Sequence, residues 1–140
     1  PFRALADTPV GMTAHIRYRA WDDENAGTLS PFVVGEIIRR RIGFDGLLLT
    51  DDLDMEALSG TVPERAARAI AAGCDIALNC WAKMDDMVGI ANLLPAMGEG
   101  TGARLERALK GTQSAFNSTQ QAALLAKRDA LPGSRHERGG

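Results

Sequence analysis

The sequence predicts an α/β protein built from parallel βαβ units. Segments with strand character alternate three times with segments of helical periodicity, and the connections between them are short. The second and third strand segments are short apolar runs, as expected for strands that are buried on both faces of a parallel sheet. A repeated strand–helix order with short connections is typical of parallel strands joined by right-handed crossovers.

The first half of the chain contains two predicted strands and one predicted helix. Residues 10–18 alternate loosely between apolar and polar side chains, which indicates a strand. Ser30 and Pro31 form a helix start, an N-cap residue followed by proline at the first helical position. Apolar residues then recur at helical spacing until Gly43, a residue type that commonly ends helices. Three consecutive leucines, residues 47–49, form the second predicted strand.

The second half repeats the alternation. Residues 61–64, with the sequence TVPE, have the form of a capping box, so a second helix is predicted at about 63–72. A third short buried strand is predicted at 75–80, followed by a helix at about 84–97. A further helix, at about 103–117, follows the glycine-rich sequence GEGTG.

The chain is expected to divide into a body, residues 1–117, and a tail, residues 118–140. The tail has one weakly helical patch at 122–131 and then a polar end that has no apolar surface to bury, so we expect disorder there. A three-stranded parallel sheet leaves two open edges and is a poor independent domain. The simplest interpretation is that the sequence is the end of a larger α/β protein.

Composition excludes several classes of function. Lys and Arg number 16 against 18 Asp and Glu and do not cluster with aromatic residues, which argues against nucleic-acid binding. No apolar run approaches the roughly 20 residues that span a bilayer, so no membrane role is expected. Cys74 and Cys80 have neither metal-ligand spacing nor a histidine nearby, and are expected to be reduced core residues of a cytosolic protein. No signal-peptide pattern is visible.

Three aspartates, Asp51, Asp52 and Asp54, follow the second predicted strand in the sequence LLLTDDLDM. In parallel α/β folds the catalytic groups lie where strands end. Strand alternation places Asp51 on the face of the first and third leucines and Asp52 on the other face. One carboxylate can therefore serve chemistry while the other braces the turn.

The aspartates also allow two other interpretations. Aspartates at a strand end often simply cap the following loop or helix. A receiver-like phosphoacceptor would use one of them to bind Mg²⁺, with an acidic pair after an earlier strand and a lysine after a later one. Neither the acidic pair nor the lysine occurs, because the first predicted strand ends in RYR and the third in NC.

Four ordered segments make a resemblance specific: GMTAHIRY, TLSP, IGFDGLLLTDDLDMEAL and AAGCDIALNC. Together they resemble the closing part of the glycoside hydrolase family 3 β-N-acetylhexosaminidases of the bacterial NagZ type, over about residues 1–110. The resemblance implies a partial TIM (β/α)₈-type barrel, about its last three βα units, with residues 1–117 as the carboxy-terminal portion of the barrel domain.

The resemblance also implies an activity. Enzymes of this family remove terminal β-linked N-acetylglucosamine by a retaining, two-step route and need no metal or organic cofactor. The implied substrate is a cytoplasmic muropeptide that is released during peptidoglycan recycling. By the motif, the first aspartate of the pair is the nucleophile, which is Asp51 in this sequence.

Two more residues are candidates for substrate binding. Met55 is the motif methionine, which could line a sugar pocket or fill the core below the loop. His15, in the MTAH segment, could reach the same site from the neighbouring strand, although a hydrogen-bonded structural histidine is the simpler interpretation. Trp21 and Trp81 each follow a strand and could stack on a sugar, but packing within surface loops is the simpler interpretation of both.

The sequence departs from the family in two ways. Asp54 stands where the family has a small hydroxyl residue. The family's KHFPGHG segment and its acid/base loop do not occur in the 140 residues. General acid help is typically worth about 10² to 10⁴ in rate, so the isolated chain is expected to be inactive unless a complementary barrel fragment supplies it. The alternative is a non-enzymatic α/β module or pseudo-enzyme remnant that acts as an assembly partner.

Overall fold

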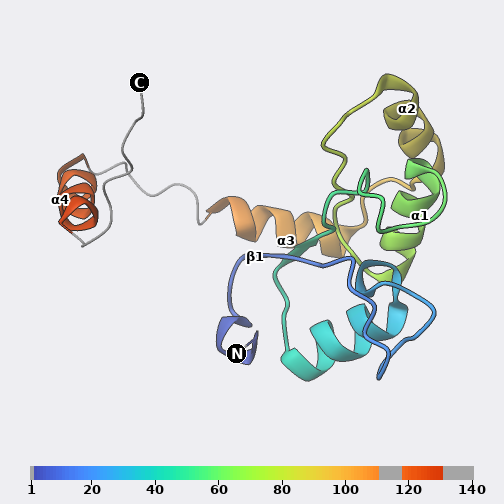
Figure 1. The fold of residues 1–140 in the computed structure, drawn as a ribbon, viewed down its shortest axis with the longest axis horizontal. Coiled ribbons are helices and arrows are strands. Elements are labelled where there is room, and N and C mark those ends of the chain that lie inside the picture. Colours follow the sequence, from blue (N-terminus) through green and yellow to red (C-terminus); the bar gives the residue numbers. More distant parts are fainter. Residues whose placement is uncertain (1, 111–117, 131–140) are drawn as a thin grey trace.

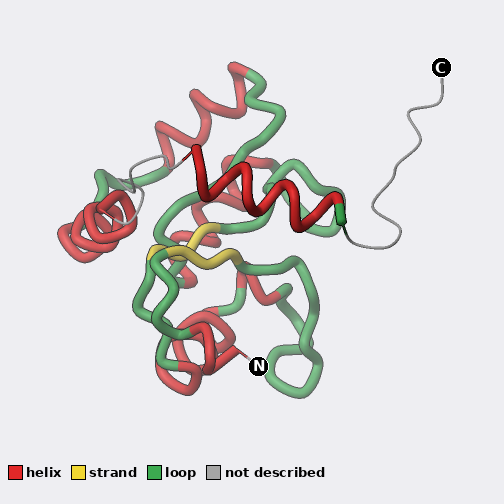
Figure 2. The backbone as a smooth tube through the Cα atoms, turned by 90° about the vertical axis from the view of Figure 1, so that its left-hand side faces the viewer, coloured by secondary structure: helices red, strands yellow, loops and turns green. Residues whose placement is uncertain are grey.

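The computed structural model describes residues 2–110 and 118–130, and Figures 1 and 2 show their arrangement. The elements follow one another in this order: η1 (Phe2–Leu5), β1 (Val10–Met12), η2 (Gly27–Leu29), η3 (Phe32–Ile42), β2 (Leu47–Leu49), α1 (Val62–Ala72), α2 (Met84–Leu93), α3 (Glu99–Lys110) and α4 (Ser118–Asp129). Both strands are short, and helices and loops make up most of the rest.

The two strands form a parallel pair in which Gly11 lies opposite Leu48. The chain passes from β1 to β2 through η3, so the predicted parallel βαβ unit is confirmed. β1 is shorter than the predicted strand 10–18. Beyond Met12 only one further ladder bond forms, from Thr13 N to Leu49 O at 2.9 Å, because β2 ends there.

The predicted third strand, 75–80, is wrong in extent. It is reduced to a parallel bridge between Leu49 and Ile76. Side chains take over where the ladder would continue: the Thr50 hydroxyl accepts the amide of Leu78 at 2.8 Å, and the Asp52 carboxylate accepts that of Cys80 at 3.1 Å. The segment still runs alongside β2, held by backbone bonds such as Thr50 N to Ile76 O and Leu53 N to Leu78 O, both at 2.9 Å, together with these side-chain acceptors.

The signals at helix ends were largely correct. The Ser30 hydroxyl accepts the Val33 amide at 3.1 Å, and Gly43 ends η3 in the left-handed region with φ of 85°. η3 is a π-helix, which its sequence spacing did not indicate. At α1 the capping box is confirmed, since Thr61 and Glu64 bond to each other's backbone N–H groups.

Two helix boundaries differ from the prediction. α2 ends at Leu93 because Leu94 precedes a proline and is extended, with φ −83° and ψ 140°. α3 begins at Glu99 and includes two glycines of the GEGTG sequence. Its Thr101 and Arg104 side chains bind Asp75, so tertiary contacts outweigh the low helix propensity of glycine. The predicted end of this helix, beyond residue 110, lies outside the described residues.

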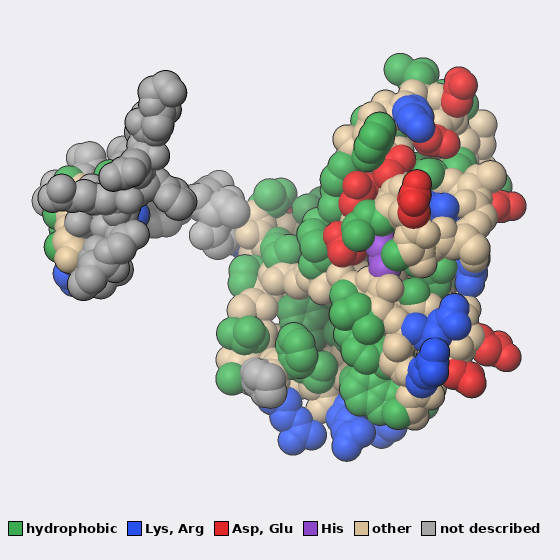
Figure 3. Space-filling view, in the orientation of Figure 1, with side chains coloured by type: hydrophobic (Ala, Val, Ile, Leu, Met, Phe, Trp, Pro, Cys, Tyr) green, Lys and Arg blue, Asp and Glu red, His purple; other side chains and the backbone are tan. Residues whose placement is uncertain are grey.

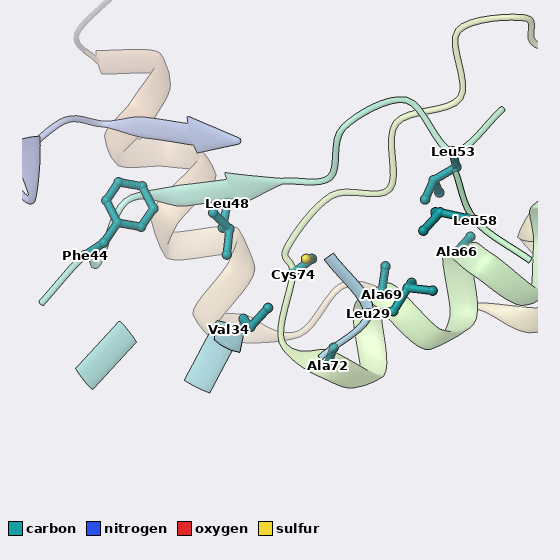
Figure 4. Close-up of a cluster of buried hydrophobic side chains, with 10 residues drawn as sticks. All are labelled: Leu29, Val34, Phe44, Leu48, Leu53, Leu58, Ala66, Ala69, Ala72 and Cys74. Atoms are coloured by element: carbon teal, nitrogen blue, oxygen red, sulfur yellow. The ribbon is translucent and has the colours of Figure 1, made fainter. Parts of the chain in front are cut away.

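The core lies between β2 and the helices that follow each strand (Figure 4). Its centre is formed by side chains from β2, η2, η3, α1 and the intervening loops: Leu29, Val34, Phe44, Leu48, Leu53, Leu58, Ala66, Ala69, Ala72 and Cys74. Three alanines of α1 let that helix pack closely against η2 and η3. A Cβ added at Gly11 would lie 2.8 Å from the Phe44 ring, so β1 also packs tightly on this side.

The opposite face of the strand pair is partly open. The register puts Val10, Met12, Leu47 and Leu49 on this face. Val10 is 45% exposed and Met12 is 56% exposed, although Leu47 is buried. Large apolar side chains of a parallel sheet are normally covered. This uncovered apolar strip is a surface on which further protein could pack.

The helix α4 covers most of the predicted patch at 122–131 and lies apart from the other helices in Figure 1. Residues 122–128 are exposed. The stretch expected to be disordered, residues 132–140, lies outside the described residues. Within residues 2–110 and 118–130, no helix is both long and apolar enough to cross a bilayer.

Candidate functional site

The candidate site is the loop that follows β2. Thr50 and Leu53 are fully buried and anchor the loop on either side of the two adjacent aspartates. The Arg65 guanidinium, from α1, donates to the carbonyl oxygens of Leu53 at 2.8 Å and Met55 at 3.1 Å. The loop is therefore fixed by core packing and by the partly buried guanidinium of Arg65. No local pattern in the sequence indicated this role of Arg65.

Asp51 is the first carboxylate after the strand and is half-buried. Its Oδ1 accepts the backbone N–H of Asp52 at 2.9 Å. Within the part of the chain that the structure describes, no cation pairs with Asp51. Asp51 lies in a bend two residues beyond the end of β2, and its expected position on the face of Leu47 and Leu49 stays a prediction.

Asp52 and Asp54 have a different role, because they hold the loop against the segment that follows residue 75. Asp52 Oδ1 accepts the amides of Cys80 at 3.1 Å and Asp54 at 3.2 Å. Burial would raise the pKa of the Asp52 carboxyl, but these backbone N–H groups outweigh it and lower the pKa. Asp54 Oδ2 accepts the amide of Trp81 at 3.1 Å. Asp52 thus braces the turn, one of the two roles expected for the pair.

His15 lies beside this loop and both of its ring nitrogens are engaged. Nε2 is 2.9 Å from the carbonyl oxygen of Asp52, which can only accept, so Nε2 carries the hydrogen. Nδ1 is 2.8 Å from the Thr28 hydroxyl, and that hydroxyl is 2.8 Å from the hydroxyl of Thr13. In the neutral ring Thr28 donates to Nδ1 and Thr13 donates to Thr28. His15 therefore ties the Asp52 peptide to the first strand, and its role in substrate binding stays a prediction.

A cavity of about 410 Å³ opens next to the loop. It is lined by Asp52, Asp54, Met55, Glu56, Trp81 and Lys83. Met55 is 44% exposed there, so its side chain is free to touch a ligand, although its role in substrate binding also stays a prediction. Asp51 and His15 are not part of the lining. Figure 3 shows acidic side chains gathered on the upper half of the molecular face that it draws.

Neither cysteine is a strong candidate nucleophile. Both are free thiols, but Cys74 is buried and Cys80 is exposed, so the expected core position is wrong for Cys80. Burial raises the pKa of Cys74 to about 12. Partial desolvation and the nearby carboxylates, Asp52 first, raise the pKa of Cys80. Because the thiolate is the reactive form, both thiols are weak nucleophiles near neutral pH.

Comparison with known proteins places this site in a family. The chain matches the glycosyl hydrolase family 3 N terminal domain over residues 1–114, and it belongs to that family. It is similar to the beta-hexosaminidase of Chromobacterium violaceum, with 42% identity over 111 residues that cover 76% of this chain and 31% of that protein. The beta-hexosaminidase of Tolumonas auensis is 37% identical over 131 residues, covering 86% of this chain and 37% of that protein. The chain thus spans about a third of the length of these relatives.

Solved structures support the same relationship. Native NagZ from Neisseria gonorrhoeae superimposes with a TM-score of 0.67 at 27% identity, covering 94% of this chain and 40% of that one. A family 3 beta-N-acetylglucosaminidase from Paenibacillus gives the same TM-score and identity over 84% of this chain and 26% of that one. The resemblance to this family is therefore confirmed, and the chain is an α/β segment of it.

Proposed function

We propose that this chain forms part of a retaining β-N-acetylglucosaminidase in which Asp51 is the nucleophile. The observation that carries the proposal is the contrast within the aspartate group. Asp52 and Asp54 use their carboxylates to hold amides of the residue 80–81 turn, whereas Asp51 pairs with no described cation and accepts only the amide next to it. The names of the relatives, beta-hexosaminidases, supply the reaction class.

The chemistry fits a carboxylate in this position. A retaining glycosidase needs an ionised carboxylate beneath the anomeric carbon and a proton donor about 5–5.5 Å away. Attack by Asp51 forms a bond from its carboxylate oxygen to the anomeric carbon, while the bond to the leaving oxygen breaks and that oxygen takes a proton. A water molecule then attacks the anomeric carbon and gives up a proton, and the bond from that carbon to Asp51 breaks, which releases the sugar. A carboxylate fixed directly after a strand meets the geometric tolerance of this step better than one on a free loop.

The fold proposed for the complete site is a (β/α)₈-type barrel of which residues 1–117 supply about the last three βα units. The parallel pair β1–β2, its crossover through η3 and the bridged segment after residue 75 support this arrangement. In it, the uncovered strip with Val10 and Met12 faces the barrel interior, and Asp51 emerges on the same side at the strand ends. A complementary barrel segment would cover the strip and bring the acid/base group. Residues 118–140 form a tail outside the barrel.

The substrate class proposed is a cell-wall muropeptide with a terminal β-linked N-acetylglucosamine, cleaved in the cytoplasm during peptidoglycan recycling. The similarity to a solved NagZ supports this choice. No metal or organic cofactor is required by the two-step carboxylate route, and none enters the proposed mechanism.

A chimera tests the proposal on a complete barrel. The part of the Chromobacterium violaceum beta-hexosaminidase that aligns with this chain is replaced by the 111 matched residues. The chimera should hydrolyse a fluorogenic β-N-acetylglucosaminide, and a 5-fluoro N-acetylglucosaminyl fluoride should label Asp51 in a peptide map. Labelling at any other residue refutes the assignment of the nucleophile. A folded but inactive chimera would favour the alternative, a non-enzymatic α/β module that serves as an assembly partner.

A further inference from the structure

The turn at residues 79–82 is held in place by three side-chain acceptors. Asp52 accepts the amide of Cys80, Asp54 accepts that of Trp81, and the Asn79 side chain accepts that of Ala82, each at 3.1 Å. Ala82 has φ of 47°, in the left-handed region that residues other than glycine rarely occupy. Strained backbone of this kind often occurs at functional sites, and here three hydrogen bonds hold it in place. The side chain that this turn exposes is therefore a candidate for binding.

The turn presents the indole of Trp81 to solvent. This ring is 72% exposed, the largest exposed fraction among the big hydrophobic side chains in the described residues. The Lys83 ammonium lies 5.5 Å from the ring centroid, a cation–π contact that helps to orient the indole. Trp21 is the natural contrast, because it is 43% exposed and packs against Tyr18 with ring centroids 5.4 Å apart. Trp21 therefore behaves as a residue of surface packing, and Trp81 does not.

The cavity beside Trp81 has the size and the polarity of a small-ligand site. Its volume of about 410 Å³ falls within the range of about 300–1,000 Å³ typical of ligand pockets. Its lining combines an aromatic face, the thioether of Met55, the carboxylate acceptors of Asp54 and Glu56, and the ammonium donor of Lys83. Such a lining offers one flat apolar surface and a rim of hydrogen-bonding groups.

This combination selects among ligand chemistries. Phosphorylated ligands would meet three carboxylates and only one ammonium. A simple apolar ligand would make no use of the carboxylate and ammonium groups of the lining. A pyranose fits both features, since its axial C–H groups form an apolar face that suits the electron-rich face of an indole, and its hydroxyls donate to carboxylates.

We propose that this cavity binds a pyranose ring stacked on Trp81, and that in the enzyme it holds the sugar on the leaving-group side of the scissile bond. The second part rests on the proposed function. Asp51 does not line the cavity but precedes Asp52, which does, so the two sites are neighbours along the same loop. Asp54 then has a use that a small hydroxyl residue would lack, because its carboxylate fixes the backbone that carries the indole.

Binding is tested first on the 140-residue chain. N,N′-diacetylchitobiose is titrated while saturation-transfer NMR follows the sugar and tryptophan fluorescence follows the protein. Trp81→Ala should weaken binding about tenfold, as expected when one aromatic stacking contact is lost. Trp21→Ala is the matched control and should bind as the unaltered chain does. Because Trp81 is exposed, circular dichroism should show both variants folded. Equal binding by the unaltered chain and the Trp81→Ala variant, or no binding by either, overturns the proposal.

A second experiment separates this inference from the proposed function. In the chimera, Trp81→Ala should lower the ratio of kcat/KM for chitobiose to kcat/KM for N-acetylglucosaminyl fluoride about tenfold, because the fluoride has no sugar in its leaving group. An unchanged ratio, with Asp51 still labelled by the 5-fluoro reagent, refutes the leaving-group site alone. Failure of labelling at Asp51, with chitobiose binding still dependent on Trp81, refutes the nucleophile alone.

Discussion

Aspartates lie near both ends of β2, and the surroundings of those aspartates are opposite. Asp75, from the segment that follows α1, accepts the amide of Leu48, and its side chain, only 4% exposed, pairs with Arg39 at 2.6 Å and Arg104 at 3.1 Å. The nearby Asp45 pairs with Arg104 and Arg107. Where the strand ends, Asp51, Asp52 and Asp54 accept hydrogen bonds from backbone amides and pair with no arginine among the described residues.

This difference separates structural from chemical use of the same side chain. Arginines neutralise the buried charge at the first end and connect η3, α3 and β2. Backbone amides at the other end orient the carboxylates without cancelling their charge. A negative charge kept in a fixed position is what a nucleophile at a developing sugar cation requires. The two groups of aspartates can be altered separately, because Asp51 lies beyond the end of β2 and Asp75 and Asp45 lie near its beginning.

The largest expected effect is at the strand end. Asp51→Asn in the chimera should lower kcat by about 10⁴-fold or more, the scale seen when a member of a catalytic group is removed. Asp45→Asn is the matched control, because it removes a carboxylate at the opposite end, 74% exposed, that the reaction does not use. A fluorogenic N-acetylglucosaminide measures both. Comparable losses in the two variants would contradict the division of roles.

The next largest effect is on stability. Asp75→Asn should reduce the free energy of unfolding by about 3 kcal/mol, because it leaves the partly buried Arg39 without its carboxylate partner and Arg104 with only the exposed Asp45. The exposed pairs of Asp45 contribute little, so Asp45→Asn should cost less than about 1 kcal/mol. Urea unfolding of the 140-residue chain, followed by circular dichroism, gives both values. An Asp45 variant as unstable as the Asp75 variant would show that burial does not decide the strength of these pairs.

Lowering the pH should reduce the stability of the fold by protonating the Asp75 carboxylate. Burial opposes ionisation of Asp75, but the Leu48 amide, the Thr101 hydroxyl and the two arginines lower its pKa. A group with a lowered folded-state pKa contributes stability above its unfolded pKa, about 3.9, and that stability is lost as pH falls through the folded-state pKa. The free energy of unfolding should therefore decrease below about pH 4. Asp75→Asn should flatten that decrease, and an unchanged slope would exclude Asp75 as its source.

The smallest expected effect is at His15, which joins the first strand to the strand-end loop. His15→Phe removes the hydrogen bonds to Asp52 O and to Thr28, and should cost about 1.5 kcal/mol of stability. His15→Gln keeps a donor for the carbonyl oxygen and should cost less. Urea unfolding compares the two variants. Imidazole ¹⁵N shifts of the unaltered chain should show hydrogen on Nε2, and the opposite tautomer would contradict the bonding described.

Sequence patterns were sufficient where the cause is local. The capping box at Thr61, the left-handed glycines that end η3 and α1, and the βαβ order all follow from neighbouring residues. The early end of α2 also has a local cause, because a proline follows Leu94 in the sequence.

Other features depend on partners that are far apart in the sequence. The third strand is shortened because Thr50 and Asp52 capture the amides of residues 78 and 80. His15 meets Thr28 and the Asp52 carbonyl only once both strands are paired. The pairing of Arg39 with Asp75 spans 36 positions. Periodicity contains no information about such pairs, so the site could be located from the motif but its bracing could not.

The close packing of Gly11 on the Phe44 ring has a consequence for how β1 and β2 align. A shift of one residue would put the Cβ of Val10 or Met12 where only a hydrogen fits, since a carbon at that point lies 2.8 Å from the ring. The Phe44 ring thus restricts the two strands to the register in which Gly11 lies opposite Leu48. This register places His15 beside the Asp52 carbonyl oxygen, to which it donates a hydrogen bond. Phe44, at one end of the sheet, therefore determines the position of the hydrogen bond at the other end.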